Sequence, residues 1–166
     1  MIPKPLPKVA IIILNWNSWE DTIECLESLQ HQTYPNYQII LVDNGSKDDS
    51  VEKIKQWCKG EIKVDTKFVR FSERFKPVEY VEYQKAAVER RGKSDQDLRL
   101  GNYSSPREMV IIETGENVGF TGGNNIGIRH ALKSPYDYFW LLNSDIVVDK
   151  EALAELVKFA EMKREV

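Results

Sequence analysis

Four short polar clusters stand directly after apolar runs in this sequence of 166 residues, and each could contact a polar ligand. They are Asn15-Trp16-Asn17, Asp43-Asn44-Gly45-Ser46, the segment 117–125, and Asn143-Ser144-Asp145. Amide and carboxylate side chains make directional hydrogen bonds, and carboxylates also hold hard cations. One such cluster would indicate only a turn, but four in the same position predict a polar ligand site.

Two residues of these clusters have a specific chemistry of their own. Asp145 could hold Mg²⁺ or Mn²⁺ if a substrate diphosphate supplied further oxygen ligands, and the alternative is a turn residue that caps a helix. Trp16 could stack on a nucleobase, and the alternative is packing in the core. The residue types alone leave both alternatives open.

Glycines are concentrated in one segment of the chain, residues 115–127. Bare backbone at the start of a helix attracts anions, so this segment predicts a cradle for a phosphate or a sugar. The alternative is a tight turn that leads into a helix packed closely on a sheet. Neither a P-loop nor a Gly-x-Gly dinucleotide fingerprint occurs, which argues against an ATPase and a nicotinamide enzyme.

The elements that carry these clusters follow an α/β pattern. Continuous apolar runs at 9–14, 38–42, 109–112 and 138–142 predict strands of a mostly parallel sheet that is buried on both faces. Segments with helical spacing separate them, so helices are expected to flank the sheet. Ser46 and Asp49 form a capping pattern before the second of these helices. In such a sheet, ligands bind outside the carboxyl ends of the strands.

A highly charged stretch, at about 65–108, interrupts this pattern and is expected to be an insertion at the sheet edge. Its residues 77–83 alternate in polarity and predict an edge strand. The stretch is interpreted as a solvated surface excursion, with a functional lid as the alternative.

Composition limits the classes of function. The net charge of −3 gives no basic field for binding nucleic acid. The apolar run at 9–14 is too short to cross a bilayer, so membrane association is expected only through segments outside this chain. The two cysteines suit a reducing compartment, and we expect the cytoplasm or the cytoplasmic face of the membrane. The length predicts a single domain over residues 1–166.

Taken together and in this order, the clusters resemble the nucleotide-sugar-binding portion of family 2 glycosyltransferases, which have the GT-A fold. The resemblance rests on Asp43-Asn44-Gly45-Ser46-x-Asp48, on the glycine- and asparagine-rich segment 117–127, and on Leu141-Leu142-Asn143-Ser144-Asp145. It covers nearly the whole chain except the insertion. In detail the sequence looks most like the rhamnosyltransferase-like branch, which implies a place in the biosynthesis of cell-envelope polysaccharides.

The resemblance implies a role for each matching residue. Those implied to bind the nucleotide sugar are Asn15 and Trp16 in the base pocket, Asp43 on the base, Asn117, Gly123, Asn124 and Asn125 along the ribose and diphosphate, and also Asn44 and Asn143. Asp145 would bind the metal, Mg²⁺ or Mn²⁺, at the position of the family's Asp-x-Asp motif. In two places the chain departs from the pattern: the first aspartate of that motif is Asn143, and Asn124 stands where many members have arginine.

The implied reaction is inverting transfer of a sugar from a nucleoside diphosphate to a hydroxyl of an acceptor glycan or lipid-linked glycan. The family's catalytic base lies in an acceptor-binding half, which we expect beyond Val166. This chain alone is therefore expected to be incomplete for turnover. It would be either a truncated piece of an enzyme or a stand-alone donor-binding module.

Two other functions are considered. A non-catalytic interaction module would keep the GT-A-like fold and use the insertion to bind a partner protein. A nucleotidyltransferase on a related sheet would need a glycine-rich, basic loop after the first strand, and Asn15-Trp16-Asn17 has neither glycine nor charge.

Overall fold

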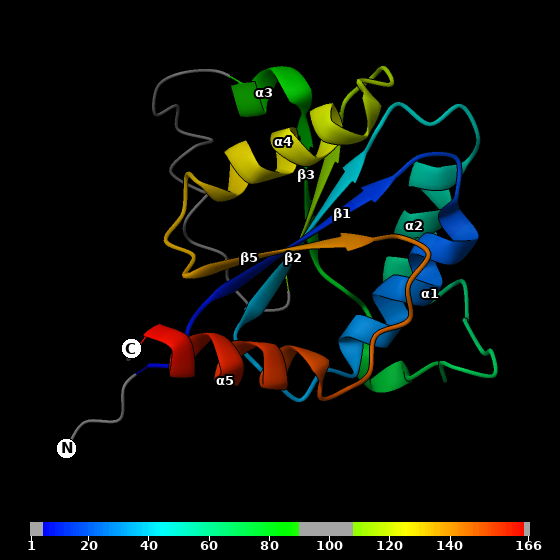
Figure 1. Cartoon of the computed structure of the whole chain (residues 1–166). Coiled ribbons are helices and arrows are strands. Elements are labelled where there is room, and N and C mark those ends of the chain that lie inside the picture. The colour runs from blue at the N-terminus through cyan, green and yellow to red at the C-terminus, as the bar shows by residue number, and fades with distance from the viewer. Residues whose placement is uncertain (1–4, 90–107, 165–166) are drawn as a thin grey trace.

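The computed structural model describes residues 5–89 and 108–164 and contains one sheet, in which every pair of neighbouring strands is parallel (Figure 1). The strand order is β3-β4-β2-β1-β5. The strands are β1 (Val9–Asn15), β2 (Tyr37–Asp43), β3 (Tyr80–Gln84), β4 (Met109–Glu113) and β5 (Tyr138–Asn143). This confirms the predicted α/β class and the four strands expected from the apolar runs.

Helices cover both faces of the sheet, with α1, α2 and α5 on one face and α3 and α4 on the other (Figure 1). They are α1 (Trp19–Gln30), α2 (Ser50–Lys59), α3 (Lys85–Glu89), α4 (Gly119–Ala131) and α5 (Ala152–Arg164), and a short 3-10 helix, η1, spans Glu73–Phe75. No helix among the described residues is long and apolar enough to cross a bilayer.

The two cores follow from the alternation of side chains along β1. Val9, Ile11 and Ile13 pack with the helices α1, α2 and α5, whereas Ala10 and Ile12 pack on the side of α4. A strand that is covered on both faces must be apolar at every position, because successive side chains point to opposite faces. The uninterrupted apolar run therefore fits a central strand.

Glycines let α4 lie unusually close to the sheet. A Cβ atom on Gly123 would be 2.3 Å from Leu14 Cδ1, and one on Gly127 would be 2.6 Å from Ile12 Cγ2. Real Cβ atoms do not approach other atoms so closely. At these two positions, glycine serves the close packing of a helix on a sheet, which is the alternative that the sequence left open.

The predicted insertion extends the sheet. Its edge strand is confirmed, although β3 begins at Tyr80 and ends at Gln84, slightly later than the alternation indicated. β3 pairs in parallel with β4, and α3 follows it directly and lies against α4. Residues 90–107 of the insertion lie outside the described residues.

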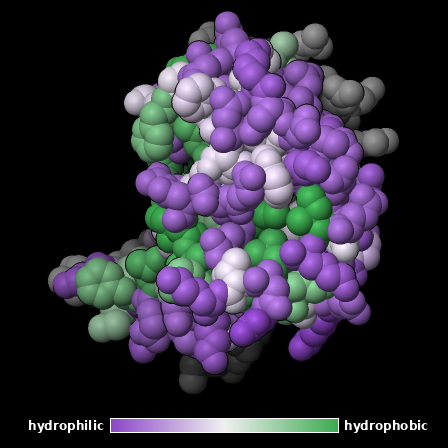
Figure 2. Space-filling model, turned by 90° about the vertical axis from the view of Figure 1, so that its right-hand side faces the viewer, coloured by the Kyte–Doolittle hydropathy of each residue, from purple (hydrophilic) through white to green (hydrophobic). Residues whose placement is uncertain are grey.

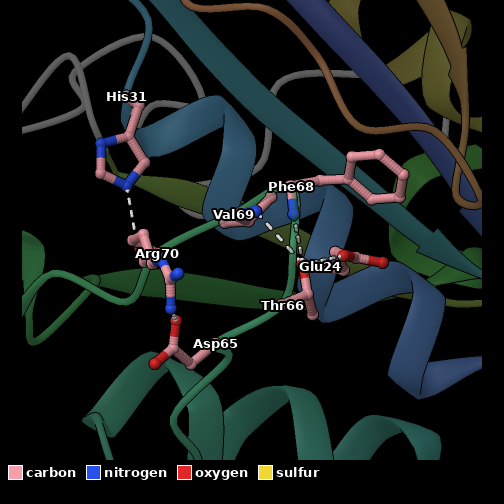
Figure 3. A network of polar contacts seen from close by, with 7 residues as sticks. All are labelled: Glu24, His31, Asp65, Thr66, Phe68, Val69 and Arg70. Carbon is pink, nitrogen blue, oxygen red and sulfur yellow. Dashed lines mark hydrogen bonds and ion pairs between the residues drawn. The ribbon is translucent and has the colours of Figure 1, made fainter.

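The first part of the insertion is fastened to α1 by polar contacts (Figure 3). The Thr66 hydroxyl donates to Glu24 Oε1 of α1 at 2.5 Å and accepts the backbone N–H groups of Phe68 and Val69, both at 3.1 Å. Further along, His31 Nε2 contacts the Arg70 carbonyl oxygen at 3.0 Å. The phenyl ring of Phe68 points away from these contacts (Figure 3).

The start of α2 differs from the predicted capping pattern. The helix begins at Ser50 with Asp49 at its N-cap, and Ser46 lies before it. The Ser46 hydroxyl donates to Asp43 Oδ1 at 2.5 Å, and its N–H donates to Asp43 Oδ2 at 3.0 Å. Ser46 therefore joins the end of β2 and does not cap a helix.

Candidate functional site

A cavity of about 510 Å³ opens at the carboxyl ends of the central strands. Figure 2 views the side of the molecule toward which the strands point in Figure 1, and apolar residues form a broken band there between hydrophilic regions. The residues that line the cavity are Leu14, Trp16, Ser18, Asp21, Asn44, Asn117, Gly119, Phe120, Asn143, Ser144 and Asp145.

All four predicted clusters contribute to this cavity. The side chains of Trp16, Asn117, Asn143 and Asp145 are exposed in its wall, and Asn44 is buried at its edge. These residues come from four loops that are far apart in the sequence. They meet because parallel strands bring the loops after their carboxyl ends to one edge of the sheet.

Two predicted base contacts, Asn15 and Asp43, do not line the cavity. They are the last residues of β1 and β2, and their exposed fractions are 0% and 3%. Asn15 Nδ2 donates to Asp43 Oδ1 at 2.8 Å, and Asn15 Oδ1 accepts the hydroxyl of Thr22 at 2.7 Å. In the structure, this pair ties the ends of both strands to α1, and its contact with a base stays a prediction.

The glycine- and asparagine-rich residues of α4 are divided between packing and solvent. Gly123 lies against Leu14, and Asn124 is buried, with its Nδ2 donating to the Phe120 carbonyl oxygen at 2.9 Å. Asn125 is exposed but does not line the cavity. Contact of these residues with the ribose and diphosphate therefore stays a prediction.

Asn44 fixes the loop that leads into α4. Its Oδ1 accepts the Val118 N–H at 3.0 Å, and its Nδ2 donates to Asn117 Oδ1 at 3.1 Å. Asn117 Oδ1 also accepts the Gly119 N–H at 2.8 Å. The side chain of Asn44 thus links two walls of the cavity, one after β2 and the other before α4.

The structure adds cavity residues to which the sequence assigned no role of their own, namely Leu14, Ser18, Asp21, Gly119, Phe120 and Ser144. The sequence indicated Ser18 and Asp21 only as a capping pair. Their side chains do bond, with Ser18 Oγ donating to Asp21 Oδ2 at 2.8 Å, but they also face the cavity. Phe120 carried no signal beyond its place in the glycine-rich segment.

Oxygen ligands for a cation are present in part. The carboxylates of Asp21 and Asp145 line one cavity together with the side chains of Asn143 and Ser144. Within residues 5–89 and 108–164, no group of three or more histidine, cysteine or acidic residues could hold a metal by itself. This donor set fits a hard cation whose remaining ligands come from a diphosphate.

The charge of Asp145 also acts on a thiol of α1. The pKa of Cys25 is raised to about 12, mainly because the thiol is buried and secondarily because Asp145 is negative. The Cys25 thiol also contacts the Asn143 carbonyl oxygen, with 3.8 Å between sulfur and oxygen. Cys25 is therefore a protonated, structural thiol below the cavity.

A second cavity, of about 420 Å³, lies between α1, the loop of Figure 3 and residues 147–150. The residues that line it are Ser28, His31, Phe68, Val69, Arg70, Val147, Val148, Asp149 and Lys150. None of the predicted site residues contributes to it, so the candidate site is the first cavity.

A parallel sheet with helices on both faces and a polar cavity at its carboxyl edge defines the doubly wound class of α/β domain, in which ligands bind at that edge. The model of glycosyl transferase family 2 matches residues 10–78 and 100–166. The chain belongs to this family, as its motifs indicated.

Solved structures of similar proteins show that the fold is GT-A. The mannosyltransferase PcManGT of Pyrobaculum calidifontis, in complex with GDP-Man and Mn²⁺, matches 93% of this chain with a TM-score of 0.61 and 16% identity. TarS 1–349 of S. aureus, in complex with UDP-GlcNAc, matches 93% with a TM-score of 0.57 and 16% identity.

Among relatives in sequence, the glycosyltransferase AglE of Haloferax volcanii is 41% identical over 54 residues, which is 31% of this chain and 18% of AglE. The chain also spans 32% of the mannosyltransferase chain and 31% of the TarS chain. It thus corresponds to a minor part of the length of each of these proteins.

Proposed function

We propose that the cavity at the carboxyl edge of the sheet binds a nucleoside-diphosphate sugar together with Mg²⁺ or Mn²⁺. The observation that carries this proposal is the convergence of Trp16, Asn44, Asn117, Asn143 and Asp145 in one cavity. A similar fold holds UDP-GlcNAc in TarS and GDP-Man with Mn²⁺ in the mannosyltransferase. The donor would serve inverting transfer to a hydroxyl of an acceptor glycan or lipid-linked glycan.

In this reaction, an acceptor oxygen bonds to the sugar's anomeric carbon as the bond to the diphosphate breaks. Negative charge grows on the leaving diphosphate, and a divalent cation held by Asp145 would, when bound, supply Lewis-acid stabilisation of that charge. Asp145 is the proposed metal ligand. The side-chain amides of Asn117 and Asn143 can donate hydrogen bonds to oxygen atoms of the nucleotide sugar. Asn44 holds the loop that carries Asn117.

We assign donor binding, and not a catalytic base, to this domain. The chain spans about a third of the solved relatives, and the proposed acceptor-binding half and base lie outside it. The same proposal includes a single donor-binding domain that is located in the cytoplasm or at the cytoplasmic face of the membrane. The family membership favours this function over an interaction module or a nucleotidyltransferase.

Calorimetry with UDP, dTDP and GDP, each with and without Mn²⁺, tests the proposal. We expect at least one nucleotide to bind more tightly with the metal present. If none of the three binds at about millimolar concentration, which corresponds to about −4 kcal/mol, the proposal is refuted.

The metal assignment has a separate test. Asp145→Asn should remove the effect of Mn²⁺ on nucleotide binding, because the substitution removes the charge of the proposed metal ligand and leaves only Asp21 as a carboxylate in the cavity lining. Asp65→Asn is the matched control, since Asp65 is exposed, pairs with Arg70 and does not line this cavity. An unchanged metal effect in Asp145→Asn would move the metal to other ligands.

A further inference from the structure

Two large aromatic side chains stand exposed in the wall of the candidate donor cavity. Trp16, in the turn after β1, is 53% exposed, and Phe120, in the first turn of α4, is 66% exposed. Most other residues that line this cavity are polar or acidic. The cavity therefore combines flat apolar surfaces with hydrogen-bonding groups and carboxylates.

The exposure of Phe120 is imposed by the surrounding structure. Gly119, immediately before it, has a φ of +77°, which favours glycine, and its N–H is bound by Asn117. On the other side of the residue, the Phe120 carbonyl oxygen accepts the buried Asn124 amide at 2.9 Å. The backbone is thus fixed on both sides of Phe120, and its ring does not fold into the core.

A ligand that suits both kinds of surface has a planar, aromatic part and a polar, anionic part. A nucleoside diphosphate has this composition, because its base stacks on aromatic rings and its diphosphate accepts hydrogen bonds and binds cations. When a base covers an exposed aromatic ring, the free energy of binding becomes more favourable, since apolar surface is removed from water. The diphosphate alone would gain nothing from such a ring.

We infer that Phe120 is a contact for the nucleobase of the donor and that it acts with Trp16 as a stacking surface in this cavity. The inference rests on the proposed function and adds a base-contacting residue to it. The ring of Phe120 contributes to affinity for the nucleoside part and not for the diphosphate. Because stacking does not depend on hydrogen-bond readout, its effect is similar for UDP and GDP.

The test compares nucleotide and inorganic pyrophosphate binding, both with Mn²⁺, in the wild-type chain and in variants. Phe120→Ala should weaken binding of UDP and GDP about 5- to 150-fold, the range measured for loss of one stacking aromatic residue. Pyrophosphate binding should stay within about twofold, and Phe120→Tyr should restore nucleotide binding because it keeps the ring. Phe68→Ala is the matched control, since Phe68 is 67% exposed and does not line the donor cavity.

Several outcomes would overturn the inference. These are unchanged binding of UDP and GDP in Phe120→Ala, an equal loss of pyrophosphate binding, and failure of Phe120→Tyr to restore nucleotide binding. Thermal unfolding of each variant distinguishes a lost contact from a lost fold, and little change is expected because the ring is mostly exposed. If the wild-type chain binds no nucleotide, the proposed function fails and this inference fails with it. If the wild-type chain binds nucleotide and Phe120→Ala binds it equally well, the proposed function stands and this contact is refuted.

Discussion

Gly127 of α4 lies so close to Ile12 of β1 that a Cβ atom on the glycine would be 2.6 Å from Ile12 Cγ2. The same Cβ atom would be 3.2 Å from Val42 Cγ2 of β2. Both neighbours are fully buried, so neither can move without disturbing the core. The distance between α4 and the sheet thus depends on the absence of a side chain at position 127.

Gly127→Ala should therefore destabilise the fold, although alanine favours a helix more than glycine does. We expect a loss of about 1–3 kcal/mol in the free energy of unfolding, the usual effect of overpacking a core. Urea denaturation measures it. Thr121→Ala, at an exposed position of the same helix, should change stability by less than about 0.5 kcal/mol. A stabilised Gly127→Ala variant would mean that α4 can shift away from the sheet.

Asn44→Asp tests the clamp between the loop after β2 and the start of α4. The substitution keeps an oxygen for the Val118 N–H but replaces the Nδ2 donor that contacts Asn117 Oδ1. In the variant, a carboxylate oxygen would face Asn117 Oδ1 with no hydrogen between them. Because the site is buried, we expect a loss of about 1–3 kcal/mol in the free energy of unfolding, measured by chemical denaturation. Nucleotide binding should also weaken, since Asn117 lines the cavity.

Asn36→Asp provides the matched control for that substitution. Asn36 Nδ2 donates to the Leu6 carbonyl oxygen at an exposed site far from the cavity. Water can replace this hydrogen bond, so the loss should be smaller than at Asn44. Equal losses at the two positions would contradict a clamp at Asn44.

Glu27 and Lys76 form a buried ion pair, with 3.1 Å between Lys76 Nζ and Glu27 Oε2. The side chain of Lys76 is 6% exposed and that of Glu27 is 0% exposed. Glu27 also accepts Trp57 Nε1–H at 2.7 Å. Glu27→Gln alone should cost about 3–5 kcal/mol of unfolding free energy, because it leaves the buried Lys76 charge unpaired. The double variant Glu27→Gln/Lys76→Met should recover much of this loss.

Chemical denaturation of Glu27→Gln, of Lys76→Met and of the double variant gives the coupling free energy of the pair. Burial lowers the pKa of Lys76, and the charge of Glu27 opposes this effect. Additive losses in the double variant would show that the two charges act independently.

The buried thiols predict how stability changes at alkaline pH. Burial raises the pKa of Cys25 and of Cys58 from 9.0 to about 12 in each case. Below pH 9 both folded and unfolded chains hold these protons, and above it the unfolded chain loses them first. Stability should then fall by about 1.4 kcal/mol per pH unit for each thiol until the folded pKa is reached.

Unfolding by urea at pH 8, 9 and 10 measures this slope, and Cys25→Ala and Cys58→Ala should each reduce it. A thiol reagent at pH 8 should label neither cysteine in the folded chain and both after denaturation, since both are buried. Rapid labelling of the folded chain would contradict the burial of these thiols.

Much of the fold could be predicted from the sequence because its signals are local. The run at Val9–Leu14 is short, rich in β-branched residues and apolar at every position, which is typical of a strand covered on both faces. The polar clusters follow such runs directly, so their place at one sheet edge was predictable from the rule for parallel sheets. The assignment to the rhamnosyltransferase-like branch stays a prediction.

Only the tertiary structure decided which residues of the site are exposed in the cavity and which are buried in its support. Asn15 and Trp16 are adjacent in the sequence, yet one is fully buried and the other is 53% exposed, because β1 ends at Asn15 and Trp16 lies in the turn beyond the edge of the sheet. The role of Ser46 depended on its distance to Asp43, and a capping pattern in the sequence does not encode that distance.

The sequence by itself determined the α/β class, the central strands and the motifs that place the chain in its family, since these depend on residue type and spacing. The tertiary structure decided which residues share the cavity and which glycines serve packing. Asp21, in the first turn of α1, and Phe120, in the first turn of α4, line one cavity with Asp145 because the two helices lie on opposite faces of the sheet and both begin at its carboxyl edge. Asp21 lies 99 positions from Phe120 and 124 positions from Asp145 in the sequence, and local patterns do not specify contacts between residues so far apart.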